Sequence, residues 1–555
     1  MAEVTNTGKG RGPAAANAIV LLAIMLAVAV IALPASQTPP PAIAEFSPNA
    51  QEQITEAPPE QTSDFGEGEG GSATGNGSGT DPGPAGTVGG STTTTTQPTI
   101  DRGKVRRCVG NPPRQTEDPH SPPCVNFWEG DNGGVTAKGV TANEVRIAVP
   151  SNGTFLTPFL KHFNSRYELY GRKIVATKVG GSNTPVGMVT KAIKVDKEVD
   201  AFASTLNGDA GGREYIYYNE LARRGIVSVN GNPSMTDEAN LARNHPYEWS
   251  YLPPFDVMAR NKAEWICKSL RGKTAEFAGG SERARTRKFG LVVTVGDDGS
   301  RPNLAPMTAI LGNCGIDVSD QTHEIVKKDP SDDQFGLQQA QDIILKLQTA
   351  QVTSIICECH TQSSGLYMAP IATKQGYFPE WLFGTYMYQA EDIHVQFWDG
   401  SQMDHSFGLG WWNKQVTAEQ SPWFWALRDA DPSFQWGSEP FDYYEARWLY
   451  NSLLVLVSGL QLAGPNLTAD TFAVGLQRAT FPNPNHGQTP YWQADVGFKG
   501  DHSFINDAAL VWASKSQPSS WSNVPGAVCY ARQGQRYSFG RWPSDYAGLF
   551  QLPCY

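Results

Sequence analysis

Short apolar runs alternate with stretches of helical periodicity through most of the chain after residue 139. The runs at 145–149, 174–179, 199–205, 225–230, 289–295 and 352–357 are rich in β-branched residues and predict buried strands. Between the first two runs, Phe155, Phe159, Phe163 and Tyr167 recur every fourth residue, the pattern of a helix with one buried face. Strands that alternate with helices predict a parallel sheet covered on both faces.

The remaining helices of this pattern are marked by apolar spacing. We expect helices at Val189 and Ile193, from Tyr215 to Leu221, around Trp265, and from Leu304 to Leu311, and another that carries Leu337, Ala340, Ile344 and Leu347. A further short apolar strand is expected after Gly315.

The sequence FGLVVTVGDDGS, residues 289–300, joins a strand to a polar turn. In parallel sheets, ligands bind outside the carboxyl ends of the strands. This turn, with Asp297 and Asp298, is therefore a candidate site. Paired carboxylates for acid and base catalysis normally converge from separate elements, so a polar turn before a helix is the simpler interpretation.

The ordered part is expected to begin near Cys108 and to span about 450 residues, beyond the size at which single cores usually stop growing. Two lobes are therefore expected. Pro253 and Pro254 interrupt the alternation after Tyr251 and mark a crossing between the lobes, since paired prolines break helices and sheets.

The N-terminal part predicts an extracytoplasmic protein. Residues 1–17 form a short cytoplasmic tail with Lys9 and Arg11, and the apolar block at 18–35 is long enough for a transmembrane signal-anchor helix. The alternative is a signal peptide cleaved after Ala42-Ile43-Ala44, which would leave a secreted protein.

Residues 36–107 consist mainly of Pro, Gly, Ser, Thr, Glu and Gln and predict a disordered linker. The linker contains a GxGxxG pattern at Gly66, Gly68 and Gly71, but no strand precedes it, so it does not indicate a nucleotide site. The formal net charge of −11 argues against nucleic acid as a partner.

The eight cysteines also favour an oxidising compartment. We expect disulfides between Cys108 and Cys124, Cys267 and Cys314, and Cys529 and Cys554, although eight cysteines allow 105 pairings. Cys357 and Cys359 remain, and a bond between them in an extended strand would be strained. The adjoining His360 invites a metal interpretation, but no second ligand pair exists, so neither a metal nor a cofactor is predicted.

Aromatic residues crowd the segment from Trp381 to Trp448. They predict either core and inter-lobe packing or an aromatic-lined ligand cleft, and the role of residues 388–440 stays open.

Six stretches, in this order, resemble the type I periplasmic solute-binding proteins, close to the branched-chain amino-acid receptors of ABC transporters. They are GVTANEVRI (139–147), residues 200–208 with GIVSVNGNPSMT (225–236), KFGLVVTVGDDGS (288–300), residues 332–356, YYEARWLYNSLLVLVSGLQLAG (443–464), and residues 497–501 with 508–512. The resemblance covers roughly residues 139 to 515 and rests on the order of the stretches.

The resemblance implies an α/β fold of two Rossmann-like lobes joined by three crossings, near 251–254, 412–416 and 491–495. After a disulfide-closed segment at 108–138, lobe one would comprise 139–252 and 417–490, and lobe two 253–416 and 491–555. The resemblance places ligand contacts at strand ends, where hydroxyl, amide and backbone N–H groups suit a polar head. These contacts would be Ser204, Thr205, Asn230, Asn232, Ser234, Asp297, Asp298, Glu358, His360, Thr385 and Tyr386.

Two departures from the family pattern change the expected ligand. Asp298-Gly299 replaces the usual Tyr-Gly, and the acid that meets an α-ammonium has no clear equivalent near Thr385. An aromatic or otherwise apolar solute with a polar head is therefore favoured over a branched-chain amino acid.

The folded region contains no GxSxG, HExxH or comparable hydrolase motif, and a non-enzymatic role is predicted. The expected function is capture of a small solute and its delivery to the membrane permease of an ABC importer. The alternative is a membrane-tethered ligand sensor or scaffold.

Overall fold

The computed structural model describes residues 106–150, 154–205, 213–230, 236–296, 299–327, 333–360, 363–385, 389–436, 440–481 and 494–554. The expected anchor at 18–35 and nearly all of the linker lie outside these residues. Among the helices that are described, none combines the length and apolar character needed to cross a membrane.

The first sheet is wholly parallel and has the order β2-β1-β3-β4-β5. This 2-1-3-4-5 order is that of doubly wound flavodoxin-like sheets, in which the strand order reverses between the first and third strands. The strands are β1 (Glu144–Val149), β2 (Lys173–Lys178), β3 (Ala203–Thr205), β4 (Val227–Asn230) and β5 (Glu248–Ser250).

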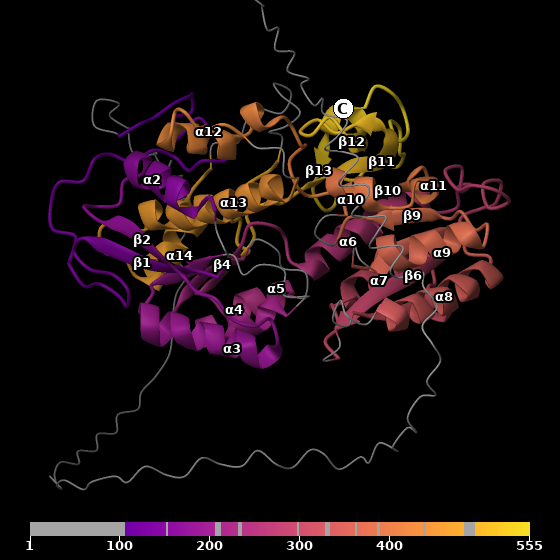
Figure 1. The fold of residues 1–555 in the computed structure, drawn as a ribbon, viewed down its shortest axis with the longest axis horizontal. Coiled ribbons are helices and arrows are strands. Elements are labelled where there is room, and N and C mark those ends of the chain that lie inside the picture. The colour runs from indigo at the N-terminus through magenta and orange to yellow at the C-terminus, as the bar shows by residue number, and fades with distance from the viewer. Residues whose placement is uncertain are drawn as a thin grey trace, which may run out of the picture. The chain divides into compact units, whose positions relative to one another are not determined.

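Helices cover both faces of this sheet, with α2 and α13 on one side and α3 and α4 on the other (Figure 1). The aromatic stripe predicted from the sequence forms the buried face of α2, where Phe159 and Phe163 are fully buried. The helices are α2 (Leu156–Arg166), α3 (Pro185–Lys194), α4 (Glu214–Arg223), α5 (Glu238–Arg243), α12 (Pro422–Ala430), α13 (Pro440–Ala463) and α14 (Ala469–Arg478).

The predicted strand at 199–205 is shorter than expected. A π-helical turn, Val195–Val199, extends α3, and Asp200 then takes a left-handed conformation with φ 50°. Extended pairing therefore starts only at Ala203. The strand expected directly after Gly315 is also displaced, because Ile316 and Val318 are buried without strand pairing and β7 begins at Thr322.

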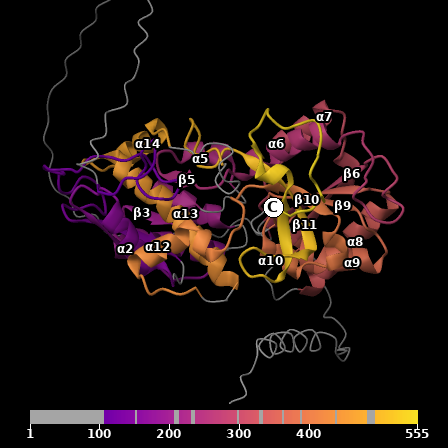
Figure 2. The same ribbon diagram turned by 90° about the horizontal axis from the view of Figure 1, so that it is seen from above.

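The second sheet repeats the same order in its parallel part, β7-β6-β8-β9-β10, and then adds antiparallel strands (Figure 2 shows β10 beside β11). The predicted α/β class with parallel-rich sheets is confirmed. The strands are β6 (Phe289–Gly296), β7 (Thr322–Lys327), β8 (Ser354–Glu358), β9 (Glu380–Phe383), β10 (Ser406–Gly410), β11 (Ala508–Pro518), β12 (Pro525–Tyr530) and β13 (Arg536–Tyr537).

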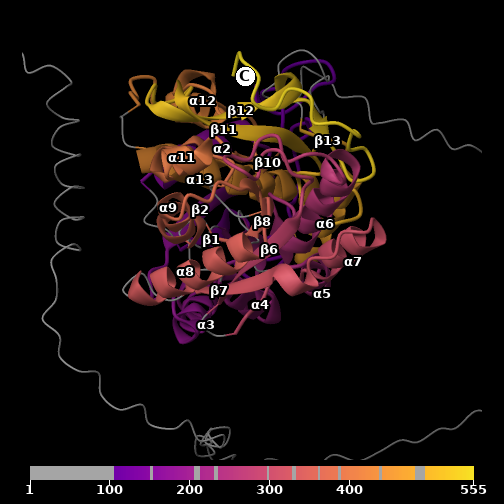
Figure 3. The same ribbon diagram turned by 90° about the vertical axis from the view of Figure 1, so that its right-hand side faces the viewer.

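Helices α6 and α7 lie on one side of β6 and β8, and α8 and α9 lie on the other (Figure 3). The helices of this part are α6 (Phe255–Trp265), α7 (Ala305–Asn313), α8 (Asp333–Thr349), α9 (Ala369–Lys374), α10 (Asp392–Phe397) and α11 (Gly400–Met403). Short π- or 3₁₀-helical turns occupy Ile266–Leu270, Ser319–Gln321, Ser363–Met368, Ala418–Gln420 and Ala531–Gly534.

Three segments carry the chain between the elements of the two sheets: 251–254 after β5, 411–417 after β10, and 494–507 before β11. The third segment lies against β5, since the Phe504 N–H donates to the Ser250 carbonyl at 2.9 Å. Arg536 joins two of the segments because its guanidinium donates to the carbonyls of Trp411 and Trp412 and to the Asp507 carboxylate. Tyr491 to Gln493, part of the third expected crossing, lie outside the described residues.

The structure forms disulfides between Cys108 and Cys124, Cys267 and Cys314, and Cys529 and Cys554. A fourth joins Cys357 and Cys359, a pairing expected to be strained within an extended strand. Only Cys357 belongs to β8, which ends at Glu358, so the pair spans the end of the strand rather than its interior.

Candidate functional site

The described candidate residues lie at or just after the carboxyl ends of four strands. Ser204 and Thr205 end β3, Asn230 ends β4, Glu358 ends β8, and Thr385 follows β9. β3 and β8 each flank the point where the strand order of their sheet reverses. The other candidates, Asn232, Ser234, Asp297, Asp298 and Tyr386, lie outside the described residues.

Two of these residues, Ser204 and Glu358, have internal partners, and their expected ligand contacts stay predictions. The Ser204 hydroxyl donates to the Ala148 carbonyl at 2.9 Å and lies 2.8 Å from the Tyr217 hydroxyl, so it ties β3 to β1 and α4. The Glu358 carboxylate lies 2.6 Å from the Lys262 ammonium, and both side chains are almost fully buried.

The Thr205 and Thr385 hydroxyls are buried and have no hydrogen-bond partner in the described part of the chain. A buried polar group without a partner is costly, so each hydroxyl is suited to a ligand or an ordered water. Asn230 is also buried, and its backbone carbonyl accepts a bond from the Tyr251 N–H. His360 is half-buried, and its backbone N–H donates to the Thr294 hydroxyl at 2.7 Å.

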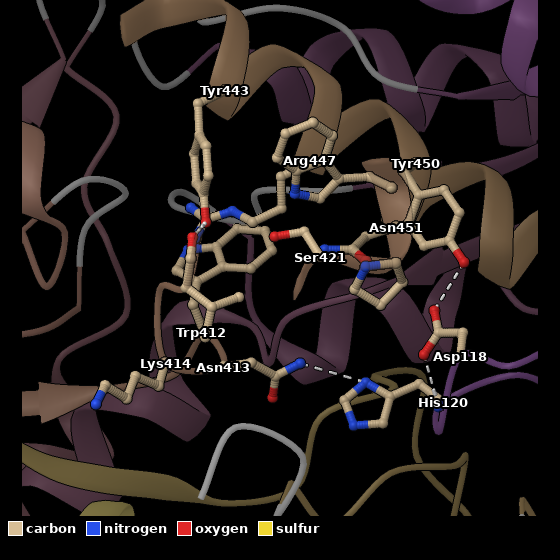
Figure 4. Close-up of a pocket in the computed structure, with 13 residues that line it drawn as sticks. Asp118, His120, Trp412, Asn413, Lys414, Ser421, Tyr443, Arg447, Tyr450 and Asn451 are labelled. Carbon is tan, nitrogen blue, oxygen red and sulfur yellow. Dashed lines mark hydrogen bonds between the residues drawn. The ribbon is translucent and has the colours of Figure 1, made fainter. Parts of the chain in front are cut away.

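A second candidate site is a cavity of about 40 Å³ within the aromatic-rich region. Its walls come from residues 118–120, the crossing segment at 412–416, the start of α12 and the first half of α13. Figure 4 shows Trp412, Tyr443 and Arg447 together on one side of the cavity, and Asp118, His120 and Tyr450 on the other.

On the side of the cavity formed by Trp412 and Tyr443, the Arg447 guanidinium contacts three aromatic rings. Its Cζ lies 4.5 Å from the centre of the Trp412 ring and 5.3 and 5.8 Å from those of Tyr444 and Tyr443, distances typical of cation–π contacts. One of its nitrogens, Nη2, lies 2.6 Å from the buried Glu391 carboxylate. Burial alone would lower the pKa of Arg447, but Glu391 and the two tyrosines raise it, so the guanidinium stays charged.

The opposite side is formed by a hydrogen-bonded network of Asp118, His120 and Tyr450. Burial raises the pKa of Asp118, whose carboxyl group accepts bonds from the Tyr450 hydroxyl and the His120 backbone N–H, both at 2.8 Å. Burial lowers the pKa of His120 to about 3, with Arg536 adding to the effect, so its imidazole is neutral at pH 7.

The sequence predicts the aromatic cluster, but its pattern alone does not identify Arg447 as part of a site. The sequence does carry a signal for this position, because Arg447 is the only basic residue of the 24-residue helix α13 and follows two tyrosines. Its partner Glu391 belongs to another segment, and that pairing could not be read from the sequence.

The described residues contain no group of three His, Cys, Asp or Glu side chains arranged to hold a metal ion. The chemistry that the two sites offer is hydrogen bonding, aromatic contact and charge pairing.

No family model and no curated protein matches the sequence. Solved structures that are similar to this chain include an ABC-transporter substrate-binding protein from Aeropyrum pernix, with 10% identity, coverage of 70% of this chain and 94% of the other, and a TM-score of 0.47. Another is a solute-binding protein from R. palustris in complex with 4-hydroxybenzoate, with 10% identity, 72% and 98% coverage, and a TM-score of 0.48.

A possible leucine/isoleucine/valine-binding protein from Rhodopirellula baltica has 12% identity, 67% and 94% coverage, and a TM-score of 0.44. With TM-scores below 0.5, these similarities carry no argument about function, and the fold assignment rests on the strand orders of the two sheets.

Proposed function

We propose that this chain is an extracytoplasmic solute-binding protein that captures a small molecule and delivers it to the membrane permease of an ABC importer. The observation that carries the proposal is the repetition of one parallel strand order in two successive sheets. Each sheet offers a strand-order reversal, the place where doubly wound sheets bind ligands.

The strand-end residues support binding rather than catalysis. Thr205 and Thr385 present buried hydroxyls, and Asn230 adds an amide at the neighbouring strand end. Such groups fix the orientation of a polar head without the acid, base or nucleophile that a reaction would need. The proposal also includes a non-enzymatic role, an apolar or aromatic solute, and an N-terminal membrane anchor at residues 18–35.

The long linker at 36–107 favours one alternative, a tethered sensor or scaffold that reports ligand binding to a membrane partner. The two roles share the same ligand site and differ in the partner. Uptake of labelled solute by cells that lack this chain would separate them, because only the transport role requires the chain for uptake.

Binding itself is tested by thermal melting of the full chain, stripped of bound solute, against amino acids, aromatic acids, amides, nucleobases and sterols. A ligand at 100 times its Kd adds about 2.7 kcal/mol to the free energy of unfolding, which shifts the Tm of a protein of this size by about 3 °C. No saturable shift in any class, with no solute in native mass spectra of the purified chain, would contradict the proposal.

A further inference from the structure

The cavity beside Arg447 is lined by buried hydrogen-bond donors that have no acceptor among the described residues. We infer that it is an anion subsite, built by Arg447 and Trp423, that receives the carboxylate of an aromatic acid. The inference rests on the proposed function and names the class of solute.

Arg447 has hydrogen-bond donors that no described residue accepts. Its side chain is 9% exposed, and its Nε and Nη1 have no hydrogen-bond partner among the residues that the structure describes. A guanidinium can only donate hydrogen bonds, and a buried charged group with unsatisfied donors is among the costliest features of a protein interior. An acceptor that enters the cavity would remove that cost.

Trp423, at the start of α12, lines the same cavity and carries a second unused donor. It is 2% exposed, and its indole Nε1 has no partner within the described ranges. An indole N–H is also a donor only, so the bound group must accept hydrogen bonds. Arg447 and Trp423 can therefore both be satisfied by one bound group that accepts hydrogen bonds.

The charges around the cavity favour an anion over a neutral acceptor. Arg447 and Lys414 line it, whereas Glu391, the ion-pair partner of Arg447, does not. The lining carboxyl group, Asp118, is held by Tyr450 and His120, and burial raises its pKa, which disfavours its charged form. A carboxylate would thus meet the Arg447 guanidinium, and its bonds to that group would be charge-assisted.

The size and walls of the cavity indicate which part of the solute enters. A volume of about 40 Å³ holds a head group of a few heavy atoms, since one water needs roughly 10–15 Å³ by the same measure. Trp412 and Tyr443 line the cavity, but their ring faces are already covered, because Arg447 lies over both rings, Tyr251 stacks on Trp412 and Trp521 stacks on Tyr443. An aryl group next to the carboxylate would meet the edges of these rings, in the edge-to-face arrangement that aromatic pairs favour.

The test compares acids with their amides, which keep the shape of the head but remove its charge. Binding of benzoate, cyclohexanecarboxylate and indole-3-carboxylate to the full chain is measured by calorimetry, with benzamide and the two other matched amides as partners. We expect the aromatic acids to bind at least tenfold more tightly than their amides, with cyclohexanecarboxylate weaker than benzoate.

Two variants and one control assign the binding to this cavity. Trp423→Phe keeps the ring and removes the N–H, and should weaken acid binding about tenfold, the effect of one charge-assisted hydrogen bond. Arg447→Met with Glu391→Gln removes the ion pair as a unit and should weaken binding at least 100-fold. Trp425→Phe, on the same helix, should change affinity less than twofold because its indole donates to the Glu419 carbonyl instead.

The outcomes separate this inference from the proposed function. Amides that bind as tightly as acids, or acid binding that both cavity variants leave unchanged, would overturn the subsite and leave solute binding intact. Failure of every acid to bind while another class of solute stabilises the chain would also overturn it. Failure of every class would overturn the proposed function as well.

Discussion

Buried charges of opposite sign meet in pairs that join distant parts of the sequence. Lys262 pairs with Glu358, Arg287 with Glu380, Arg447 with Glu391, and Arg536 with Asp507, all with side chains less than a tenth exposed. Removing one partner of such a pair leaves an uncompensated buried charge, which costs far more than the pair itself contributes. A single substitution in any of these pairs should therefore be strongly destabilising.

The first prediction concerns Lys262. Lys262→Met leaves Glu358 buried without its cation and should lower the free energy of unfolding by about 3–5 kcal/mol, measured by urea unfolding. The double variant Lys262→Met with Glu358→Gln should recover a large part of that loss. Lys346→Met is the matched control, because its pair with Asp342 is exposed and contributes less than about 1 kcal/mol. Equal losses from the two single variants would contradict the prediction.

A second prediction follows from Glu248, a buried acid at the start of β5. Burial raises its pKa to about 7, although the Asn244 side-chain amide, 2.5 Å from the carboxyl group, opposes that shift. An acid whose pKa is higher in the folded state contributes stability below its unfolded pKa, near 4.3, and loses that contribution as the pH rises through 7.

The stability lost between pH 4.5 and pH 8 from this group should be on the order of 3 kcal/mol. Glu248→Gln keeps an uncharged amide in place, so its free energy of unfolding should fall less over the same range than that of the unmodified chain. Urea unfolding at several pH values measures the difference. Parallel pH profiles for the two proteins would show that Glu248 titrates normally.

At the scale of elements, the sequence predicted most strands and helices because their apolar runs and stripes are long and regular. The exceptions have a physical cause. Val195, Val199 and Ala201 fit a strand or the end of a helix equally well by spacing, and helical hydrogen bonding continues to Val199. The residues at strand ends could be predicted because the order of strands and helices along the chain indicates a parallel sheet and where each of its strands ends. The partners of their side chains could not be predicted, because a partner such as Lys262 for Glu358 depends on packing between distant segments.

The third prediction compares two disulfides. Cys267–Cys314 joins the turn after α6 to the end of α7 over a sequence separation of 47, whereas Cys108–Cys124 spans 16. In the chain-entropy account, the longer loop restricts the unfolded chain more. Replacing both cysteines by alanine should cost about 4 kcal/mol for the first pair and about 3 kcal/mol for the second. Urea unfolding of the two double variants gives the order, and the reverse order would contradict this account.

For the whole molecule, the crossing segments place the proposed anion subsite where the chain passes between the two sheets. Trp412 of the second segment stacks on Tyr251 of the first, with ring centres 5.5 Å apart, and also faces Arg447. Arg536 holds the carbonyl of the same Trp412. A ligand bound by Arg447 would thus lie beside a residue of the segment that connects the two sheets.

The last prediction concerns how the molecule is held at the cell surface. If residues 18–35 remain as an anchor, the full chain should stay in the membrane pellet after an alkaline wash, and its intact mass should include the N-terminal residues. A variant that carries two lysines in this block should lose membrane retention, since each charge at the centre of a spanning helix costs about 3 kcal/mol. A mature chain that begins at Glu45, after Ala42-Ile43-Ala44, would instead establish a cleaved signal peptide and a released protein.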